Sequence, residues 1–378
     1  MSDYLKAHGF SDIQACDAHI HIIYRHPIEE TESILRAICE HLDYDRIAMM
    51  SMTESSNKGT DPFANVKALY LRERLGVHNY AFGSLFHWRD GRDTAQSYLD
   101  QVRKIDELGF DGVKMLEGKP IMRKRFAHPL DDPILDGFYG YIEEHRLPVT
   151  MHLTDPSTMW DRSKCSEYAI RAGWFCDETF PTRSQMFSEM EGFMRKFPKL
   201  RLTLAHLYNV EESPRAAAKF LEAHENTSFD LTPGDCMHLF LHEPENWRAF
   251  YRDYSARLMY GTDTYNISLD GKTPEEAWGY RPTHLRMFLE GHEPFEYNGE
   301  TIPPLSLDEA RVRRILRDNL IERLGDCHRP ANYALAAEEC TLLREMLQAG
   351  EFDGLVSEEH ARMELQSLNV MEAFFRAR

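Results

Sequence analysis

Short apolar runs with the residue types of β-strands alternate along this chain with longer stretches of helical periodicity. This alternation is typical of a parallel α/β fold. The strand-like runs lie at residues 13–23, 46–52, 79–86, 112–116, 148–153, 201–206, 227–231 and 257–261. Eight strands interleaved with helices is the number that a closed (β/α)8 barrel requires, and no GxGxxG motif follows the first run to favour an open doubly wound sheet.

We therefore expect an α/β fold, a TIM barrel, in residues 1–326. Two further helical patterns, at 335–347 and 358–375, predict a C-terminal helical extension (327–378) that packs on the barrel or on a partner subunit. Residues 291–304 are rich in Gly, Pro and Glu and are predicted to be a loop insertion. Helices of the barrel are predicted at 30–41, 64–75, 94–108, 133–144, 184–196, 214–224 and 307–324.

The composition excludes several classes of protein. The net charge of −18 disfavours a nucleic-acid partner, because a phosphate backbone would be repelled. An aromatic content of 11% argues against intrinsic disorder. No apolar run approaches the ~18 residues of a membrane span, and the seven cysteines form no CxxC pair, so we expect a cytoplasmic protein without disulfides.

Histidines are placed where the predicted strands end. The first strand carries Asp17-Ala18-His19-Ile20-His21, and because strand side chains alternate between faces, His19 and His21 point the same way. Two neighbouring imidazoles can hold one metal ion, although an isolated HxH pair is as often a pair of hydrogen-bonded core histidines.

Three residues from later strands favour the metal site. His152 lies near the end of the fifth strand, His206 ends the sixth, and Asp263 follows the eighth. The carboxyl ends of all strands in a parallel barrel face one mouth, where barrel active sites are found. Four imidazoles and a carboxylate at one mouth are hard to explain as packing, since titratable groups are seldom buried without a partner.

These residues resemble the amidohydrolase superfamily, and within it the amidohydrolase-related branch, which includes aminocarboxymuconate semialdehyde decarboxylase-like enzymes and lactonases. The resemblance is carried, in chain order, by DAHIH, PVTMH, FPKLRLTLAH, YGTD and ILRDN. It implies a distorted TIM barrel with a divalent metal ion at the mouth, most commonly Zn²⁺, as one ion with two not excluded.

The resemblance also implies roles for individual residues. The metal ligands are then His19, His21, His152 and Asp263, and His206 contacts the metal-activated water or the substrate. Relatives often carry glycines after the sixth-strand histidine, whereas 207–209 here are Leu-Tyr-Asn, which leaves the pocket shape open. On the fourth strand, Lys114 has three alternatives: a carboxylated bridge between two metals, a substrate-carboxylate ligand, or a salt bridge to Glu117.

This constellation predicts a metal-dependent hydrolase that attacks a small, carboxylate-bearing amide, ester or lactone with a metal-activated water. Asp263 would act as the general base, and His206 as an oxyanion stabiliser or proton donor. A non-oxidative decarboxylase with the same ligands is the alternative. A homo-oligomer is expected, and cations and aromatic residues after the strands suggest an anionic substrate bound by Arg25, Lys114, His87, Trp160 and Arg183.

Overall fold

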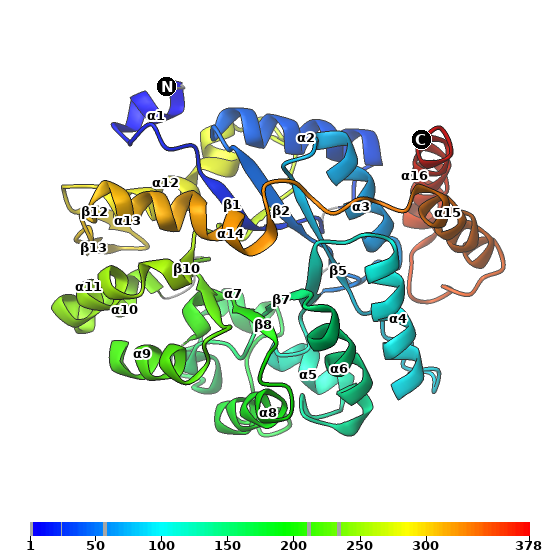
Figure 1. The fold of residues 1–378 in the computed structure, drawn as a ribbon, viewed down its shortest axis with the longest axis horizontal. Helices are drawn as coiled ribbons and strands as arrows, with labels where there is room; N and C mark the ends of the chain where they lie inside the picture. The colour runs from blue at the N-terminus through cyan, green and yellow to red at the C-terminus, as the bar shows by residue number, and fades with distance from the viewer. Residues whose placement is uncertain (1–2, 24, 56–58, 210–212, 233–235) are drawn as a thin grey trace.

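The computed structural model describes residues 3–23, 25–55, 59–209, 213–232 and 236–378. Its centre is a nine-stranded sheet of parallel pairs in the order β10-β9-β8-β7-β6-β5-β2-β1-β11 (Figure 1). The strands are β1 (Cys16–His21), β2 (Arg46–Met50), β5 (Tyr80–Ser84), β6 (Gly112–Met115), β7 (Pro148–Met151), β8 (Arg201–Leu204), β9 (Ser228–Asp230), β10 (Leu258–Met259) and β11 (Thr264–Tyr265).

The two edges of this sheet belong to one short stretch of chain. β10 pairs with β9 and β11 pairs with β1, and only residues 260–263 separate β10 from β11. In that stretch, the carbonyl of Tyr260 accepts a hydrogen bond from the amide of Ala18 in β1, at 2.9 Å. The sheet therefore curls on itself with eight segments around its circumference, and each of the eight predicted runs contains a strand. The predicted distorted TIM barrel is confirmed.

Helices surround the strands (Figure 1). They are α1 (Asp3–His8), α2 (Ile28–His41), α3 (Ala64–Leu75), α4 (Ala95–Glu107), α5 (Pro120–Phe126), α6 (Asp136–His145), α7 (Glu167–Arg171), α8 (Arg183–Lys196), α9 (Pro214–Ala223), α10 (Cys236–His242), α11 (Pro244–Asp253), α12 (Tyr280–Glu290), α13 (Glu309–Arg313), α14 (Asn319–Leu324), α15 (Tyr333–Gln348) and α16 (Glu358–Arg376). A π-helical turn, Arg314–Asp318, joins α13 to α14.

Helix α4 shows how the local sequence sets these boundaries. The side chain of Thr94 accepts a hydrogen bond from the amide of Ser97, which caps the N-terminus. Tyr98, Val102 and Ile105 recur at helical spacing and are buried against the barrel. The helix ends before Gly109, whose φ of +85° and close approach to the carbonyl of Pro330 both require glycine.

The segment 291–304 is not the predicted loop. It forms an antiparallel hairpin of β12 (Phe295–Tyr297) and β13 (Glu300–Ile302). Asn298 and Gly299 turn the chain with φ of 49° and 85°, and positive φ at both central residues suits a two-residue hairpin turn. Phe295 and Ile302 are buried, so the hairpin also has an apolar anchor. A smaller hairpin, β3 (Glu54–Ser55) with β4 (Gly59–Thr60), follows β2.

The C-terminal helices α15 and α16 pack against each other, and α16 also packs against α2 and α3 (Figure 1). Part of this contact is ionic. The ammonium of Lys67 on α3 donates to Glu364 of α16 at 2.7 Å and to Asp61 at 2.6 Å, and all three side chains are buried. The boundary at residues 326 and 327 between barrel and extension stays a prediction.

Helix α14 closes one end of the barrel. Its Leu320 packs with buried residues of β1, β2, β5 and β10 that face the barrel interior, among them Ala48, Phe82 and Met259. The side-chain nitrogen Nδ2 of Asn319 donates to the carbonyls of Ser255 and Leu258, at 2.7 and 2.6 Å. The closed end lies where the strands begin, so the polar site is left at the opposite end.

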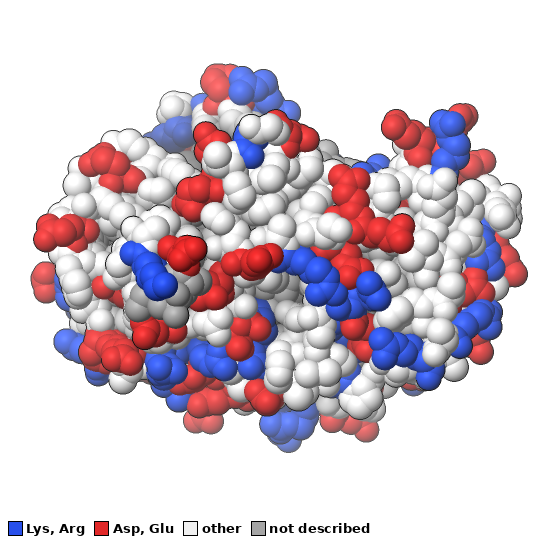
Figure 2. Space-filling view, turned by 90° about the horizontal axis from the view of Figure 1, so that it is seen from above, with Lys and Arg blue, Asp and Glu red and all other residues white. Residues whose placement is uncertain are grey.

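Figure 2 shows acidic and basic side chains interspersed over one face of the molecule. Within the described part of the chain, no helix is long and apolar enough to cross a membrane.

Candidate active site

Three of the predicted ligands meet where β1 ends and β10 gives way to β11. Nε2 of His19 lies 3.1 Å from Nε2 of His21, and His21 Nε2 lies 3.0 Å from Oδ1 of Asp263. One ligand atom from each of the three residues falls within 4.8 Å of the other two. The two-residue strand period therefore places both imidazoles on one side, as expected.

Lys114 of β6 joins this group. Its ammonium donates to Nε2 of His19 at 2.9 Å, and its side chain is buried. Burial lowers the pKa of Lys114 to about 8. The alternative that Lys114 forms a salt bridge to Glu117 is wrong. Oε1 of Glu117 contacts His87 at 2.9 Å, and Oε2 has no hydrogen-bond partner in the described structure.

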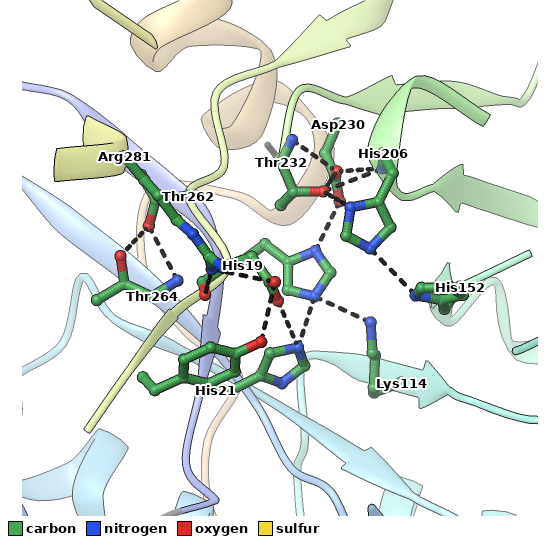
Figure 3. A network of polar contacts seen from close by, with 12 residues as sticks. His19, His21, Lys114, His152, His206, Asp230, Thr232, Thr262, Thr264 and Arg281 are labelled. Carbon is green, nitrogen blue, oxygen red and sulfur yellow. Dashed lines mark hydrogen bonds and ion pairs between the residues drawn. The ribbon is translucent and has the colours of Figure 1, made fainter. Parts of the chain in front are cut away.

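His152 and His206 form a second pair beside the first (Figure 3). Nδ1 of His152 lies 3.1 Å from Nε2 of His206, and the rings are 4.6 Å apart between centroids. The ring centroid of His206 is 6.1 Å from that of His19, so the pairs adjoin. His152 reaches the His19 group only through His206 and does not share its tight set of ligand atoms.

A buried carboxylate fixes the protonation of His19. Nδ1 of His19 lies 2.9 Å from Oδ2 of Asp230, at the end of β9, and a carboxylate can only accept. Nδ1 is therefore the protonated nitrogen, and Nε2 presents its lone pair to His21 and Lys114. Burial and the nearby Lys114 charge lower the pKa of His19 to about 3, so the imidazole is neutral at physiological pH.

The second pair is oriented in the same way. Nε2 of His152 lies 2.9 Å from Oδ1 of Asp155, so it donates and leaves Nδ1 with a lone pair. The hydroxyl of Thr232 donates to Asp230 at 2.6 Å, so it accepts from Nδ1 of His206 at 3.0 Å. Nε2 of His206 then carries a lone pair as well.

Lys119 lies beside the pair formed by His152 and His206. Its ammonium donates to Oδ1 of Asp155 at 2.8 Å, and the same oxygen accepts from His152. Burial, and then the Lys119 charge, lower the pKa of His152 to about 3. His152 and His206 thus face each other at 3.1 Å as two neutral rings with opposed lone pairs. That contact is repulsive on its own and becomes favourable beside a cation.

This donor set fits a divalent metal ion. Nε2 of His19 presents its lone pair beside His21 and Asp263, and His152 and His206 turn their lone pairs toward each other in the adjoining pair. Neutral imidazoles whose other nitrogen donates to a carboxylate or hydroxyl are the usual arrangement of metal-binding histidines. Nitrogen and carboxylate donors suit borderline divalent ions such as Zn²⁺, and the set does not select one metal.

Asp263 has two further donors on its other oxygen. The hydroxyl of Tyr265 donates to Oδ2 at 3.0 Å, and Nη1 of Arg281 lies 3.2 Å from the same atom. Burial alone would raise the pKa of Asp263, but the contact with His21 and the charge of Arg281 hold that pKa well below its usual range. The carboxylate is therefore anionic and already hydrogen-bonded before any ligand arrives.

The chain after β8 makes a left-handed turn at the site. His206, Leu207, Tyr208 and Asn209 all have positive φ, between 45° and 64°. Positions 207–209 are those where relatives were expected to carry glycine, and non-glycine residues are strained in this region. Leu207 and Tyr208 are buried, and the side-chain amide of Asn209 donates to the carbonyls of Leu153 and Thr154 at 3.1 Å, so packing and hydrogen bonds hold the turn.

A comparison with protein families shows which family has this arrangement. The family model described as "Amidohydrolase" matches residues 16–321, which is most of the chain. The chain belongs to the amidohydrolase family. The sequence-based resemblance is confirmed, and the family implies a metal-dependent enzyme with a divalent ion.

Solved structures agree with the amidohydrolase fold. A protein described as amidohydrolase II is 13% identical over 82% of this chain and 99% of its own, with a TM-score of 0.51. 2,6-Dihydroxybenzoate decarboxylase, solved with 2,6-dihydroxybenzoate, is 12% identical with the same coverage and TM-score. At this identity the likeness shows the fold alone. A comparison with curated protein sequences gave no match.

The predicted substrate-binding residues of this amidohydrolase contact other parts of the chain. His87 contacts Glu117 and the hydroxyl of Tyr98. The indole of Trp160 donates to the carbonyl of Pro181 in the long loop after β7. The two remaining residues contact backbone. Arg25 donates to the carbonyl of Thr60 at 2.8 Å, and Arg183 donates to those of Asp155 and Asn209. Their role in binding stays a prediction.

Sequence reasoning missed several polar residues of the site: Asp155, Asp230, Thr232 and Tyr265. A signal existed for two of them. Asp230 and Thr232 alternate around Leu231 at the end of a predicted strand, in the same position as the histidines of neighbouring strands. Asp155 lies in the loop after β7, and Tyr265 lies in β11, a two-residue strand outside the eight predicted runs.

Proposed function

We propose that this amidohydrolase is a metal-dependent hydrolase of a small, carboxylate-bearing amide, ester or lactone. The observation that carries the proposal is the meeting of His19, His21 and Asp263 at the barrel mouth, with the neutral pair of His152 and His206 beside them. Lys114 and Lys119 add two cations beside them, which supports an anionic substrate.

His19, His21 and Asp263 would hold the ion, with His152 completing the set. A bound divalent ion lowers the pKa of a water molecule to about 7 and polarises a substrate carbonyl, which supplies the nucleophile for hydrolysis. Zn²⁺ is the ion proposed here, since tetrahedral nitrogen and carboxylate sets with an open position are typical of catalytic zinc.

The residues of the chain then divide the work. Oδ1 of Asp263 accepts a hydrogen bond from the attacking water and orients it. Nε2 of His206 is unprotonated in the resting enzyme, so it takes a proton first and returns it to the leaving group. This changes the sequence-based assignment of Asp263 as the base, because Tyr265 and Arg281 already donate to its other oxygen.

A non-oxidative decarboxylase is the second candidate, and the contacts of Asp263 favour it. Such an enzyme needs no base for water; the substrate carboxylate leaves as CO₂ and the carbon takes a proton from an acid. A carboxylate with two donors on one oxygen is a weak base and a good anchor. The ligand named for the decarboxylase of similar fold is a hydroxylated aromatic carboxylate, so such compounds belong in the test.

The test uses metal-loaded enzyme with lactones, esters and amides of small carboxylic acids, and with hydroxylated aromatic carboxylates. Incorporation of ¹⁸O from labelled water supports the hydrolase, and release of CO₂ supports the decarboxylase instead. His206→Asn should lower kcat/KM by about 10²-fold or more at unchanged metal content. His145→Asn, an exposed histidine that contacts only its own helix and Tyr141, is the matched control and should leave the rate unchanged. Equal rates in wild type and His206→Asn would contradict the proposed mechanism.

A further inference from the structure

Four arginines gather at the closed end of the barrel, opposite the histidines. They come from separate segments that meet where the strands begin. Arg146 directly precedes Leu147 and β7, Arg201 is the first residue of β8, and Arg257 directly precedes β10. Arg323 belongs to α14, the helix that closes this end of the barrel and crosses the strands in Figure 1.

Two of the four guanidinium groups, those of Arg201 and Arg257, donate to backbone carbonyls. Arg201 donates through Nη1 to the carbonyl of Arg146 at 3.3 Å and through Nη2 to that of Arg323. Arg257 donates through Nε to the carbonyl of Thr227 at 2.6 Å, and through Nη2 to that of His224. The Arg201 side chain thus links the starts of β7 and β8 to α14, and the Arg257 side chain links the starts of β9 and β10. We call the four arginines, Arg146, Arg201, Arg257 and Arg323, the floor cluster.

No carboxylate of the described residues forms an ion pair with the floor cluster. Burial lowers the pKa of Arg257 and the charge of Glu225 opposes that shift, but Glu225 forms no ion pair with Arg257. Other arginines of the same region are paired: Arg314 contacts Glu322 at 2.8 Å on the neighbouring turn. An unpaired group of cations is unusual in a protein with 62 acidic residues and 44 basic ones.

Arg323 has unused donors that point inside. Its Nε and Nη2 atoms are shielded from solvent and have no hydrogen-bond partner among the described residues. Burial, and then the charges of Arg201 and Arg257, lower the pKa of Arg323. A shielded guanidinium with unpaired N–H groups beside two like charges is unfavourable unless an anion joins it.

We propose that the floor cluster is a binding site for a phosphate-class oxyanion, either inorganic phosphate or the phosphate group of a small ester. Guanidinium forks match the oxygens of phosphate and carboxylate groups. A carboxylate has two oxygens and is satisfied by one fork, whereas guanidiniums that arrive from β8, β10 and α14 suit an anion with more oxygens and a double charge. The site lies at the opposite end of the barrel from the histidines, so it is distinct from the proposed catalytic centre.

The test measures the melting temperature of the intact protein in sodium phosphate against sodium chloride at equal ionic strength. Inorganic phosphate at about 10 mM should raise the Tm by ~2 °C or more in the wild type. Arg323→Met and Arg201→Gln should abolish this shift. Arg313→Gln, an exposed arginine one helix away, should retain it and is the matched control. Glycerol phosphate in place of inorganic phosphate distinguishes an ester ligand from the free ion.

A second measurement separates binding from packing. In chloride alone, Arg323→Met should be at least as stable as wild type, because a repelled cation is removed. Loss of Tm by the same amount in chloride and in phosphate would mean that Arg323 only packs, and would overturn the proposal. So would a phosphate shift of equal size in wild type and both cluster variants, or no shift in the wild type.

Discussion

Oδ2 of Asp230 lies 2.9 Å from Nδ1 of His19, across 211 positions of sequence. Through this contact one buried carboxylate decides which nitrogen of the first-strand histidine faces the barrel mouth. Oδ1 of the same carboxylate accepts from Thr232, and Thr232 in turn sets the tautomer of His206. Asp230 is therefore a positioning residue for two histidines that come from different strands.

Replacement of Asp230 by Asn should weaken divalent metal binding by about 10–100-fold, because the carboxylate that holds the tautomer of His19 is lost. The measurement is a titration of the metal-free protein with Zn²⁺ against a competing chelator. Asp106→Asn, which removes a carboxylate paired with Arg329 on the outside of the barrel, is the matched control. Equal affinities in Asp230→Asn and wild type would contradict the assigned role.

Acid should destabilise the metal-free protein from about pH 6.5 downward. His19 and His152 have folded pKa values of about 3 against an ordinary value of 6.5, so below pH 6.5 the unfolded chain binds protons that the folded chain does not. Stability is therefore complete above pH 6.5 and falls by about 1.4 kcal/mol per pH unit for each histidine. Carboxylates with lowered pKa values, such as Asp263, add to the loss only below about pH 4.

Urea unfolding between pH 7.5 and 4.5 measures this slope. His152→Gln should reduce it by about 1.4 kcal/mol per pH unit, since the proton-binding difference of His152 disappears. A slope that is the same in His152→Gln and in wild type would show that His152 binds its proton in the folded protein as readily as in the unfolded chain.

Asn319→Ala should destabilise the protein by about 2 kcal/mol without changing metal content. The substitution leaves the carbonyls of Ser255 and Leu258 without their side-chain donor at the closed end of the barrel. Urea unfolding gives the free energy, and elemental analysis gives the metal content. Asn246→Ala, at an exposed asparagine that contacts Glu243, should cost less than about 0.5 kcal/mol.

Lys67→Met should lower the free energy of unfolding by about 3 kcal/mol or more at pH 7, because it leaves the buried carboxylates of Asp61 and Glu364 without their cation. Glu364→Gln should cost less, since Lys67 keeps Asp61 as a partner. Denaturant unfolding of both variants gives the order. If Glu364→Gln proved the more damaging, the ammonium would not be the group that joins α16 to α3.

The fold follows from the sequence because the barrel depends on periodic patterns. Eight apolar runs alternate with helical stretches, and a period of two aligns His19 with His21. The hairpin at Phe295–Ile302 was predicted as a loop from its Gly and Pro content, although Asn298-Gly299 between apolar residues is a strong hairpin signal.

The candidate site could be predicted from the sequence only in part. Strand ends share a mouth, so His152, His206 and Asp263 could be expected near the first-strand pair. The partners of a side chain depend on rotamers and loop paths that no local pattern records. For this reason Lys114 was assigned a bridge to Glu117 but contacts His19, and the contacts of Asp155 with His152 and Lys119 were not foreseen.

The account depends most on the claim that the imidazoles of β1 and the Asp263 carboxylate share one cation. Elemental analysis of the purified protein tests it directly, with wild type, His21→Gln and the exposed control His145→Gln measured side by side. The account predicts about one divalent ion per chain in wild type and control, and a loss of most of it in His21→Gln. Absence of a divalent ion from the wild type even after incubation with Zn²⁺ or Mn²⁺, or undiminished metal in His21→Gln, would contradict it.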